Sequence, residues 1–258
     1  MDNFEFKCPT KIIFGADTIS KLKNEIPQDR KILITYGGGS IRKNGVLKQV
    51  KEALEGFNYS EFGGIEPNPK FETLMDAVNM VKDGGYNFLL AVGGGSVLDG
   101  TKFITAASKF EGDPWDILAK GAQVNDALEL ADVITLPATG SEMNCGAVIS
   151  RISTKEKFAF MSEKVYPKFS IIDPKTTFSL PEKQTVNGIV DTYTHVMEQY
   201  ATYDVNTPLQ DQWALGIIKT LLEEGPKVLK EPENYNARAN IFWCATCGLN
   251  YWISLGAV

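Results

Sequence analysis

One carboxylate and one imidazole stand four residues apart in the stretch from Gly188 to Gln199. They are Asp191 and His195, and His195 is the only histidine among the 258 residues. On a helix, positions i and i+4 lie on the same face, so these side chains would converge on one point. An imidazole and a carboxylate suit a divalent metal ion such as Fe²⁺ or Zn²⁺. The pattern is short, and taken alone it favours a simpler Asp–His surface pair or a core histidine.

Two apolar stretches of strand character each run into the same four residues, Gly-Gly-Gly-Ser. The first run is Gly37–Ser40 and the second is Gly93–Ser96. Glycines at a strand end let the backbone approach a ligand closely, and the free N–H groups of a following helix attract a pyrophosphate. One such run would be an ordinary tight turn, whereas two at the ends of buried strands indicate a dinucleotide site. Neither matches Gly-x-Gly-x-x-Gly, so we do not expect the usual Rossmann arrangement.

Two further polar features follow these strands. Asp99 lies in the first turn of the helix predicted after the second glycine run, where it either complements the helix dipole or contacts a cofactor. The loop Pro137–Glu142 offers hydroxyl groups and free amides that would suit an adenine or a phosphate. By itself this loop is only polar, so its interpretation depends on the motifs around it.

Apolar runs alternate with amphipathic stretches as far as about residue 175. The predicted strands are 31–36, 58–62, 88–92, 133–136 and 169–173, with a hairpin formed by 147–153 and 157–161. The predicted helices are 17–24, 46–54, 71–82 and 97–110, and weak alternation over 4–14 indicates an edge hairpin. Alternating strands and helices indicate a parallel sheet with right-handed crossovers.

After Pro181 the strand pattern stops and the apolar spacing becomes helical. Helices are predicted over 185–203, 208–222 and from 238 to the end. We therefore predict an α/β fold of two domains, a Rossmann-like parallel-sheet domain over 1–180 and an all-helical domain over 181–258. The last stretch, 249–258, is apolar and uncharged, unlike most free C-termini. We expect the helical domain to be incomplete and the chain to be C-terminally truncated.

Composition limits the classes of function. Apolar residues make up 43% of the chain, and a net charge of -6 without a long basic run argues against nucleic acid or an anionic membrane as partner. We find no secretory signal and no apolar run of the ~18 residues that a membrane span needs. Cys244 and Cys247 have no second pair nearby, so we interpret them as reduced cysteines on a helix face. We expect a cytoplasmic protein with a small-molecule substrate.

Several motifs occur together and in a fixed order along the chain. They are Gly93-Gly94-Gly95-Ser96-x-x-Asp99, then Thr135-Leu136-Pro137-Ala138-Thr139-Gly140-Ser141-Glu142, then Asp191-x-x-x-His195-x-x-Glu198-Gln199. This ordered set resembles the iron-containing (group III) alcohol dehydrogenases over the whole chain, most closely their butanol dehydrogenase and broad-range aldehyde reductase branch. The resemblance implies the dehydroquinate synthase-like architecture. It also implies hydride transfer between NAD(P)H and a primary alcohol or aldehyde such as butanol or butanal.

The resemblance implies roles for particular residues. Asp191 and His195 would be catalytic residues and two of four metal ligands. The pyrophosphate would lie at the second glycine run and the adenosine ribose at the first. The residues implied to contact the cofactor are Gly38, Gly39, Ser40, Asn68, Gly94, Gly95, Ser96, Asp99, Thr135, Thr139, Asn144 and Lys157. A homodimer, formed through edge pairing of the N-terminal segment, is also implied.

The first glycine run bears on the choice of cofactor. An acidic residue at this strand end would bind the ribose 2′-hydroxyl and repel a 2′-phosphate. The chain has Gly38, Gly39 and Ser40 there, followed by Arg42 and Lys43, which leaves room and positive charge for a phosphate. We predict NADPH in preference to NADH. The open alternative is that Arg42 and Lys43 are solvated charges at a helix start.

The chain departs from the family in its metal ligands. The resemblance implies two further histidines, and none follows His195. Two hypotheses therefore stay open: a metal-dependent oxidoreductase of which this chain is one portion, and a catalytically silent nucleotide-binding fragment. A lyase of the dehydroquinate synthase-like fold is disfavoured because no basic cluster for a phosphorylated substrate is present. A metal-free relative that reduces maleylacetate is disfavoured because both Asp191 and His195 are present.

Overall fold

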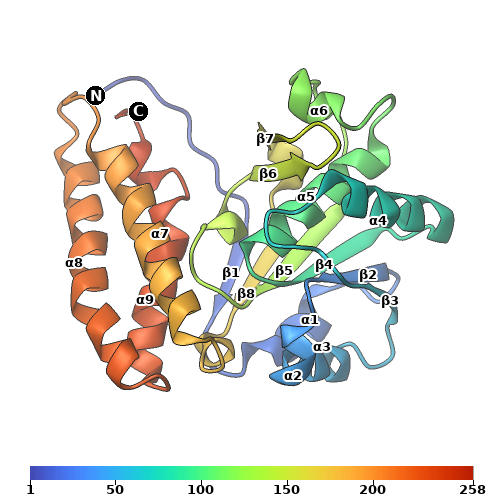
Figure 1. The fold of residues 1–258 in the computed structure, drawn as a ribbon, viewed down its shortest axis with the longest axis horizontal. Helices are drawn as coiled ribbons and strands as arrows, with labels where there is room; N and C mark the ends of the chain where they lie inside the picture. The colour runs from blue at the N-terminus through green and yellow to red at the C-terminus, as the bar shows by residue number, and fades with distance from the viewer. Residues whose placement is uncertain (258) are drawn as a thin grey trace.

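The computed structural model describes residues 1–257 and contains a parallel sheet beside a group of long helices (Figure 1). The six-stranded sheet has the order β1-β8-β5-β4-β2-β3, and each neighbouring pair is parallel. Its strands are β1 (Lys11–Phe14), β2 (Lys31–Tyr36), β3 (Asn58–Phe62), β4 (Phe88–Gly93), β5 (Glu129–Ile134) and β8 (Phe169–Ile172). A separate antiparallel pair consists of β6 (Gly146–Arg151) and β7 (Glu156–Met161). The predicted α/β class is confirmed.

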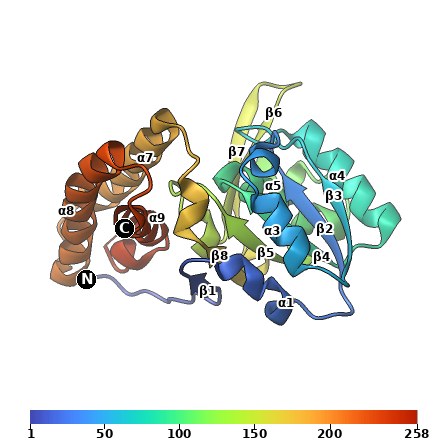
Figure 2. The ribbon, with the colours of Figure 1, turned by 90° about the horizontal axis from the view of Figure 1, so that it is seen from below.

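Helices cover both faces of the sheet. They are α1 (Leu22–Glu25), α2 (Ser40–Lys43), α3 (Val46–Ala53), α4 (Phe71–Gly84), α5 (Gly95–Lys109) and α6 (Asp116–Ala119). Helices α1 and α3 pack on one face, and α4 and α5 pack on the other (Figure 2). The central strands β2 and β4 are apolar and buried because both of their faces are covered. On α3, Val46, Leu47 and Val50 recur at helical spacing and form its buried face.

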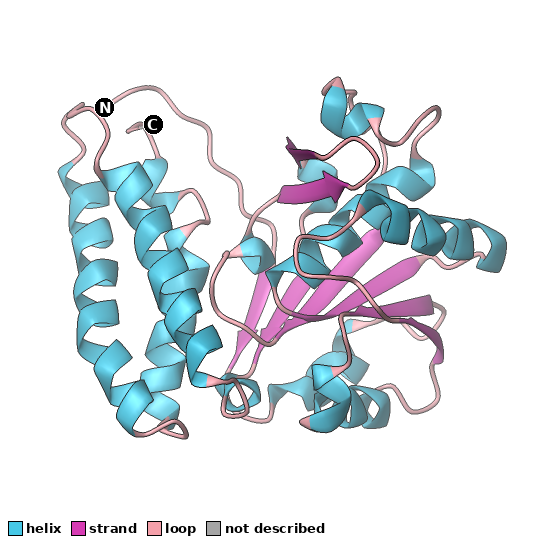
Figure 3. Cartoon of the chain, in the orientation of Figure 1, coloured by secondary structure: helices cyan, strands magenta, loops and turns pink. Residues whose placement is uncertain are grey.

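The helical half contains three long helices, drawn in cyan beside the magenta strands in Figure 3. They are α7 (Glu182–Tyr200), α8 (Pro208–Lys230) and α9 (Tyr235–Gly248). Pro208 suits the first position of α8, where no N–H donor is needed. The side chain of Asn234 caps α9 by accepting a hydrogen bond from the N–H of Ala237 at 3.1 Å. Phe242 of α9 packs with Ile134 and Ile172 of the sheet, so the two halves share an apolar cluster.

The N-terminal segment, residues 1–10, connects both halves of the molecule (Figure 1). The N–H of Asp2 donates to the carbonyl oxygen of Gly256 at 3.0 Å, and the amino group of Met1 donates to the carbonyl oxygen of Val205. The chain then reaches the sheet and enters β1, where Lys11 pairs with Phe169 of β8. The first strand therefore joins the sheet beside the last one.

Several predicted details were wrong. Residues 4–14 form no hairpin, because β1 pairs in parallel with β8, which is distant in sequence. The strand expected over 133–136 is β5, which begins at Glu129 and ends at Ile134. The helix expected to end at Leu222 continues through Pro226 to the end of α8. Helix α9 ends at Gly248 rather than at the chain end, and Val258 lies outside the described residues.

The remaining expectations about organisation have mixed outcomes. Cys244 and Cys247 are buried free thiols on α9, as expected. The division near residue 180 falls between a 3₁₀ turn, Pro174–Thr177, and the start of α7, and it stays a prediction. Over residues 1–257, no helix combines the length and the hydrophobicity that a membrane span requires.

Candidate cofactor and metal site

The second glycine run lies where β4 ends and α5 begins. Gly94 is the cap residue and Gly95 opens the helix. A Cβ on Gly95 would overlap the side chain of Thr139, and one on Gly94 would lie 3.3 Å from the Cβ of Leu136. The loop after β5 therefore packs directly on the helix start, an approach that a glycine backbone permits. The first N–H groups of α5 are held at the carboxyl edge of the sheet, where a pyrophosphate would bind.

The first glycine run lies beside the second because β2 and β4 are neighbouring strands. Tyr36 at the end of β2 is in register with Val92 at the end of β4. Gly39 has φ +96°, in the left-handed region that favours glycine, and it precedes α2. A Cβ on Gly38 would meet no atom within 4 Å, so this position has open space beside it.

Arg42 of α2 is held near the first glycine run by two partners. Its guanidinium donates to the hydroxyl of Tyr36 and lies 5.1 Å from the centre of that ring. The same group lies 3.1 Å from Oε2 of Glu61, and Lys51 forms a second ion pair with this carboxylate. Two cations share one anion here, so the surface beside the run keeps a net positive charge.

Three of the predicted cofactor residues meet at the second glycine run, although they come from different elements. Asn68 has φ +54°, and its N–H donates to Oγ of Ser96 at 3.4 Å. Nζ of Lys157 on β7 donates to Oδ1 of Asn68 at 2.8 Å. The β6–β7 hairpin is attached to this turn because the N–H of Ser150 donates to the carbonyl oxygen of Pro69 at 2.9 Å. A cofactor contact for these residues stays a prediction.

Asp99, one turn into α5, is engaged within the protein. Its Oδ1 accepts a hydrogen bond from Oγ of Ser141 at 2.7 Å, and its Oδ2 accepts one from the N–H of Val148 at 3.0 Å. Burial raises the pKa of Asp99, while the nearby ammonium of Lys102 and these hydrogen bonds oppose that rise. Asp99 therefore links α5 to the loop after β5 and to β6.

The loop after β5 carries the predicted residues Thr135, Thr139 and Asn144. The N–H of Thr135 donates to the carbonyl oxygen of Gly93 at 2.9 Å, and Oγ1 of Thr139 accepts from the N–H of Ser141 at 3.3 Å. The first bond holds the start of the turn against the second glycine run, and the second is internal to the turn, whose Thr139 packs on Gly95. The roles of the two threonines toward a cofactor stay predictions.

Asn144 uses both atoms of its side-chain amide inside the protein. Oδ1 accepts from Nζ of Lys102 and from the N–H of Gly146, each at 3.0 Å. Nδ2 donates to the carbonyl oxygens of Gly140 and Leu249, each at 3.1 Å. Asn144 therefore fixes its own loop and joins it to the helical half, whatever it contributes to a cofactor.

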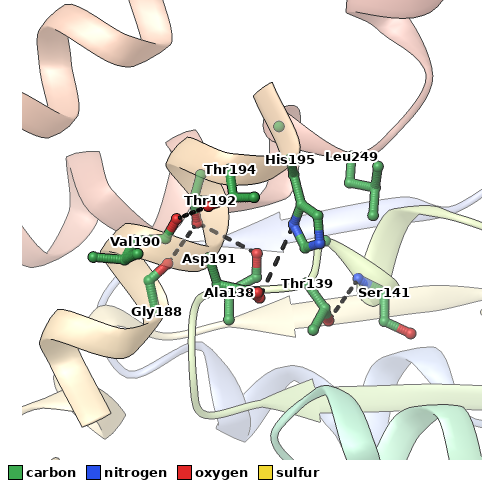
Figure 4. Close-up of polar contacts among 12 residues, drawn as sticks. Ala138, Thr139, Ser141, Gly188, Val190, Asp191, Thr192, Thr194, His195 and Leu249 are labelled. Atoms are coloured by element: carbon green, nitrogen blue, oxygen red, sulfur yellow. Dashed lines mark hydrogen bonds and ion pairs between the residues drawn. The ribbon is translucent and has the colours of Figure 1, made fainter. Parts of the chain in front are cut away.

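Asp191 and His195 lie one turn apart on α7, as the spacing predicts (Figure 4). Oδ2 of Asp191 is 4.0 Å from Nδ1 of His195. This ring nitrogen is buried and has no hydrogen-bond partner among the described residues. An unpartnered nitrogen facing a carboxylate at this separation suits a shared metal ion, because each metal–ligand bond is about 2.0–2.2 Å long.

Two small residues set how α7 approaches the loop after β5. A Cβ on Gly188 would overlap the carbonyl oxygen of Pro137. One turn later, Oγ1 of Thr192 donates to the carbonyl oxygen of Ala138 at 3.3 Å, a bond drawn in Figure 4. The helix that carries the Asp–His pair is therefore in backbone contact with the loop that packs on the second glycine run.

The metal-ligand set is partial within the described residues. Across residues 1–257, no group of three or more His, Cys, Asp or Glu side chains lies close enough together to hold a metal ion. Asp191 and His195 fit one side of a divalent site, and their oxygen and nitrogen donors suit Fe²⁺ and Zn²⁺ equally. High affinity would need further ligands in fixed geometry.

Two residues of this region were missed by reasoning from sequence. Gly188 lies inside a helical pattern, which is a known sign of close packing. Lys102 lies on the apolar inner face of α5 between Leu98 and Phe103, and a charged residue on such a face signals a buried polar partner. The partners themselves come from loops that only the fold brings near.

Two family models together match most of the chain. The model described as iron-containing alcohol dehydrogenase matches residues 9–174. The model for the C-terminal part of the Fe-containing alcohol dehydrogenase family matches residues 185–254. The chain therefore belongs to the iron-containing alcohol dehydrogenase family, and the resemblance seen in its motifs is confirmed.

Individual members of the family show which proteins this chain is similar to. Over 259 residues the chain is 54% identical to the NADPH-dependent aldehyde reductase YqhD of Escherichia coli (strain K12), covering 99% of this chain and 67% of that protein. It is 45% identical to the probable NADH-dependent butanol dehydrogenase 1 of Bacillus subtilis (strain 168), covering 100% and 67%. The crystal structure of E. coli K-12 YqhD superposes with a TM-score of 0.98 at 53% identity, covering 99% and 66% of the two chains. The chain spans about two thirds of the length of these relatives.

Proposed function

We propose that the chain forms the nucleotide-binding part, and one side of the metal site, of an oxidoreductase that transfers a hydride between NADP(H) and a primary alcohol or aldehyde. Butanol and butanal are the substrates we favour, from the names of the relatives. One observation carries the proposal. The loop after β5 contacts the second glycine run through Thr139 and contacts α7 through Pro137, so it joins the predicted cofactor site to the Asp–His pair.

In this proposal the residues at the second glycine run bind the cofactor and orient it. The free N–H groups at the start of α5 would bind a pyrophosphate, and Gly94 and Gly95 leave room for it. Lys157, held by Asn68, would present a positive charge beside that group. The bound nicotinamide supplies the hydride chemistry, and the protein supplies its position relative to the substrate.

Asp191 and His195 would hold a divalent metal ion from one side of α7. A metal ion bound there supplies Lewis-acid polarisation of a substrate oxygen. The backbone contact of Gly188 with Pro137 sets the distance between the Asp–His pair and the loop that packs on the second glycine run. The choice between Fe²⁺ and Zn²⁺ does not follow from one oxygen and one nitrogen donor.

We propose NADPH as the preferred cofactor. The first glycine run has no carboxylate to repel a 2′-phosphate, and the space beside Gly38 is open. Arg42 and Lys51 leave positive charge nearby even after pairing with Glu61. The relative named as an NADPH-dependent aldehyde reductase agrees with this choice, whereas the probable butanol dehydrogenase is named as NADH-dependent.

The deciding experiment measures aldehyde-dependent loss of NADPH absorbance. We expect turnover of butanal by the complete protein loaded with metal, and loss of turnover when that protein carries Asp191→Ala. Full activity of that variant would remove the proposed metal role. Glu182→Gln is the matched control, because Glu182 is exposed in the first turn of the same helix.

A second candidate is a catalytically silent nucleotide-binding fragment. It is favoured by the absence of a third metal ligand among residues 1–257. It predicts that the 258-residue chain binds NADPH in a calorimeter but reduces no aldehyde with any added divalent metal. Turnover by this chain would exclude it. A homodimer and a cytoplasmic location stay predictions, and sedimentation of the purified chain would test the first.

A further inference from the structure

Lys102 is a buried lysine that has no part in the function proposed above. It lies on α5, and its side chain is fully buried. Its ammonium nitrogen is 2.7 Å from the carbonyl oxygen of Ser141, 2.9 Å from that of Asn144 and 2.9 Å from that of Gly146. Side-chain oxygens of Ser141 and Asn144 add contacts at 2.9 and 3.0 Å. One ammonium group thus meets five oxygens from a single short segment.

Burying a charged ammonium group costs desolvation free energy, so a functional role for Lys102 is worth seeking. Burial lowers the pKa of Lys102 to about 8, because the charged form has lost its water. The carboxylates of Asp99 on α5, Asp132 on β5 and Glu142 in the loop oppose that shift, and Cys145 also faces the group. Burial raises the pKa of each of those three carboxyl groups. With a pKa of about 8, Lys102 is mostly charged at pH 7 and loses its proton mainly between about pH 7 and 9.

The segment 141–146 that surrounds this ammonium group is the continuation of the loop that packs on the second glycine run. Ser141 in it also donates to Asp99, and Asn144 joins the loop to Leu249 of the helical half. Three carbonyl oxygens that converge on one point would repel one another without a cation between them.

The position of Lys102 also couples it to the second glycine run. It follows Gly95 by seven residues, so it lies about 10 Å along α5 from the helix start. A dinucleotide pyrophosphate bound at that start would bring negative charge to within about that distance of the ammonium group. In a protein interior, charges at such a distance still interact, and negative charge favours the ammonium form.

We propose that Lys102 is a positioning residue of the cofactor site, whose ammonium group holds residues 141–146 in place and whose charge is coupled to the binding of an anionic dinucleotide. This inference rests on the proposed function, since it requires the dinucleotide phosphates at the start of α5. Binding of NADPH then draws a proton onto Lys102 wherever the free protein is partly deprotonated.

The test is calorimetry of NADPH binding between pH 7 and 9.5, in buffers that differ in ionisation enthalpy. We expect the wild-type chain to take up part of a proton per bound NADPH, with the largest uptake between about pH 8 and 9. The uptake should be absent in Lys102→Met, and NADPH affinity should fall about tenfold or more. Lys109→Met, an exposed position on the same helix, should keep the wild-type uptake and affinity.

The calorimetric results distinguish a failure of the proposed function from a failure of the role of Lys102. A chain that binds no NADPH at all contradicts the proposed function. NADPH binding without proton uptake in the wild-type chain, or the same uptake in Lys102→Met, overturns the role of Lys102 alone. A wild-type chain that binds NADPH without proton uptake overturns the coupling even when the methionine variant fails to fold.

Discussion

Gly188 of α7 lies directly against the carbonyl group of Pro137, with no room for a side chain between them. The carbonyl belongs to backbone, so it cannot turn aside as a flexible side chain would. This contact sets how closely the helix with the Asp–His pair approaches the loop that packs on the second glycine run.

Replacing Gly188 with alanine should therefore destabilise the protein. Forcing a methyl group into this contact should lower the free energy of unfolding by about 1–3 kcal/mol and move α7 away from the loop. Urea unfolding measures the first effect, and butanal reduction measures the second.

Gly216→Ala on α8 is the control, because its Cβ would meet no atom within 4 Å. It should stabilise the helix by about 0.5–1 kcal/mol. Equal effects of the two substitutions would contradict this account of Gly188.

Gly38→Asp should reverse the cofactor preference. The space beside Gly38 accepts a side chain, and a carboxylate there would repel the 2′-phosphate and bind the 2′-hydroxyl. We expect the ratio of NADPH to NADH affinity to fall by at least about tenfold, or about 1.4 kcal/mol. Gly38→Asn has the same shape without the charge and should change the ratio much less. An unchanged ratio in the aspartate variant would place the ribose elsewhere.

Arg42 should distinguish the two cofactors by its charge. Tyr36 and Glu61 hold its guanidinium in place, so little entropy would be lost when a phosphate binds. Arg42→Met should weaken NADPH binding about tenfold and leave NADH binding nearly unchanged, as titration by nicotinamide fluorescence would show. Lys48→Met, an exposed lysine on α3, is the control. Equal losses for both cofactors would favour a solvated, non-contacting Arg42.

The Asp–His pair should determine binding of a divalent ion by this chain. Asp191→Asn and His195→Ala each remove one of the two donors that face each other at 4.0 Å. Calorimetric titration with Zn²⁺ should show weak binding in the wild-type chain and none in either variant, since one donor cannot hold the ion. Unchanged zinc binding in both variants would show that the ion is held by other residues.

Lys102 should give the stability of the protein a distinct pH dependence. Its folded-state pKa of about 8 lies below its ordinary value of 10.5. Between these two values the unfolded chain binds more protons, so the contribution of Lys102 to the free energy of unfolding rises with pH by about 3 kcal/mol. Asp99 and Glu142 act oppositely at lower pH, because their raised pKa values give stability that is lost as pH rises. The test measures the free energy of unfolding of the wild-type protein and of Lys102→Met at pH 7 and at pH 10.5. The difference between the two proteins, compared at the two pH values, gives the contribution of the lysine.

Features that depend on short stretches of sequence could be predicted. Strand β2 and both glycine runs follow from local apolar runs and from turn chemistry, and the spacing of Asp191 and His195 follows from helix geometry. The helix predicted to end at Leu222 stops four residues before Pro226, which has no N–H for the carbonyl oxygen of Leu222. In the structure α8 continues through Pro226, and Leu222, which is 65% exposed, lies on its solvent face.

Features that depend on distant contacts could not be predicted. Nothing within residues 4–14 indicates that β1 pairs with β8, because the partner strand lies at the far end of the α/β half. The five oxygens around Lys102 come from a loop whose path is set by Asp99 and by the start of α5. Burial and partners of this kind follow from the fold as a whole.

The N-terminal segment has a consequence for how the protein is made. Strand β1 is synthesised before the other strands of this sheet, yet its partner β8 comes from residues made much later, as does Gly256, which accepts a hydrogen bond from the N–H of Asp2. Strand β1 therefore cannot pair with β8 until residues 169–172 have been made. Closure of such distant contacts is slow relative to local pairing. Strand β1 is thus translated well before its partner strand, and until β8 is made its unpaired edge can pair with another chain.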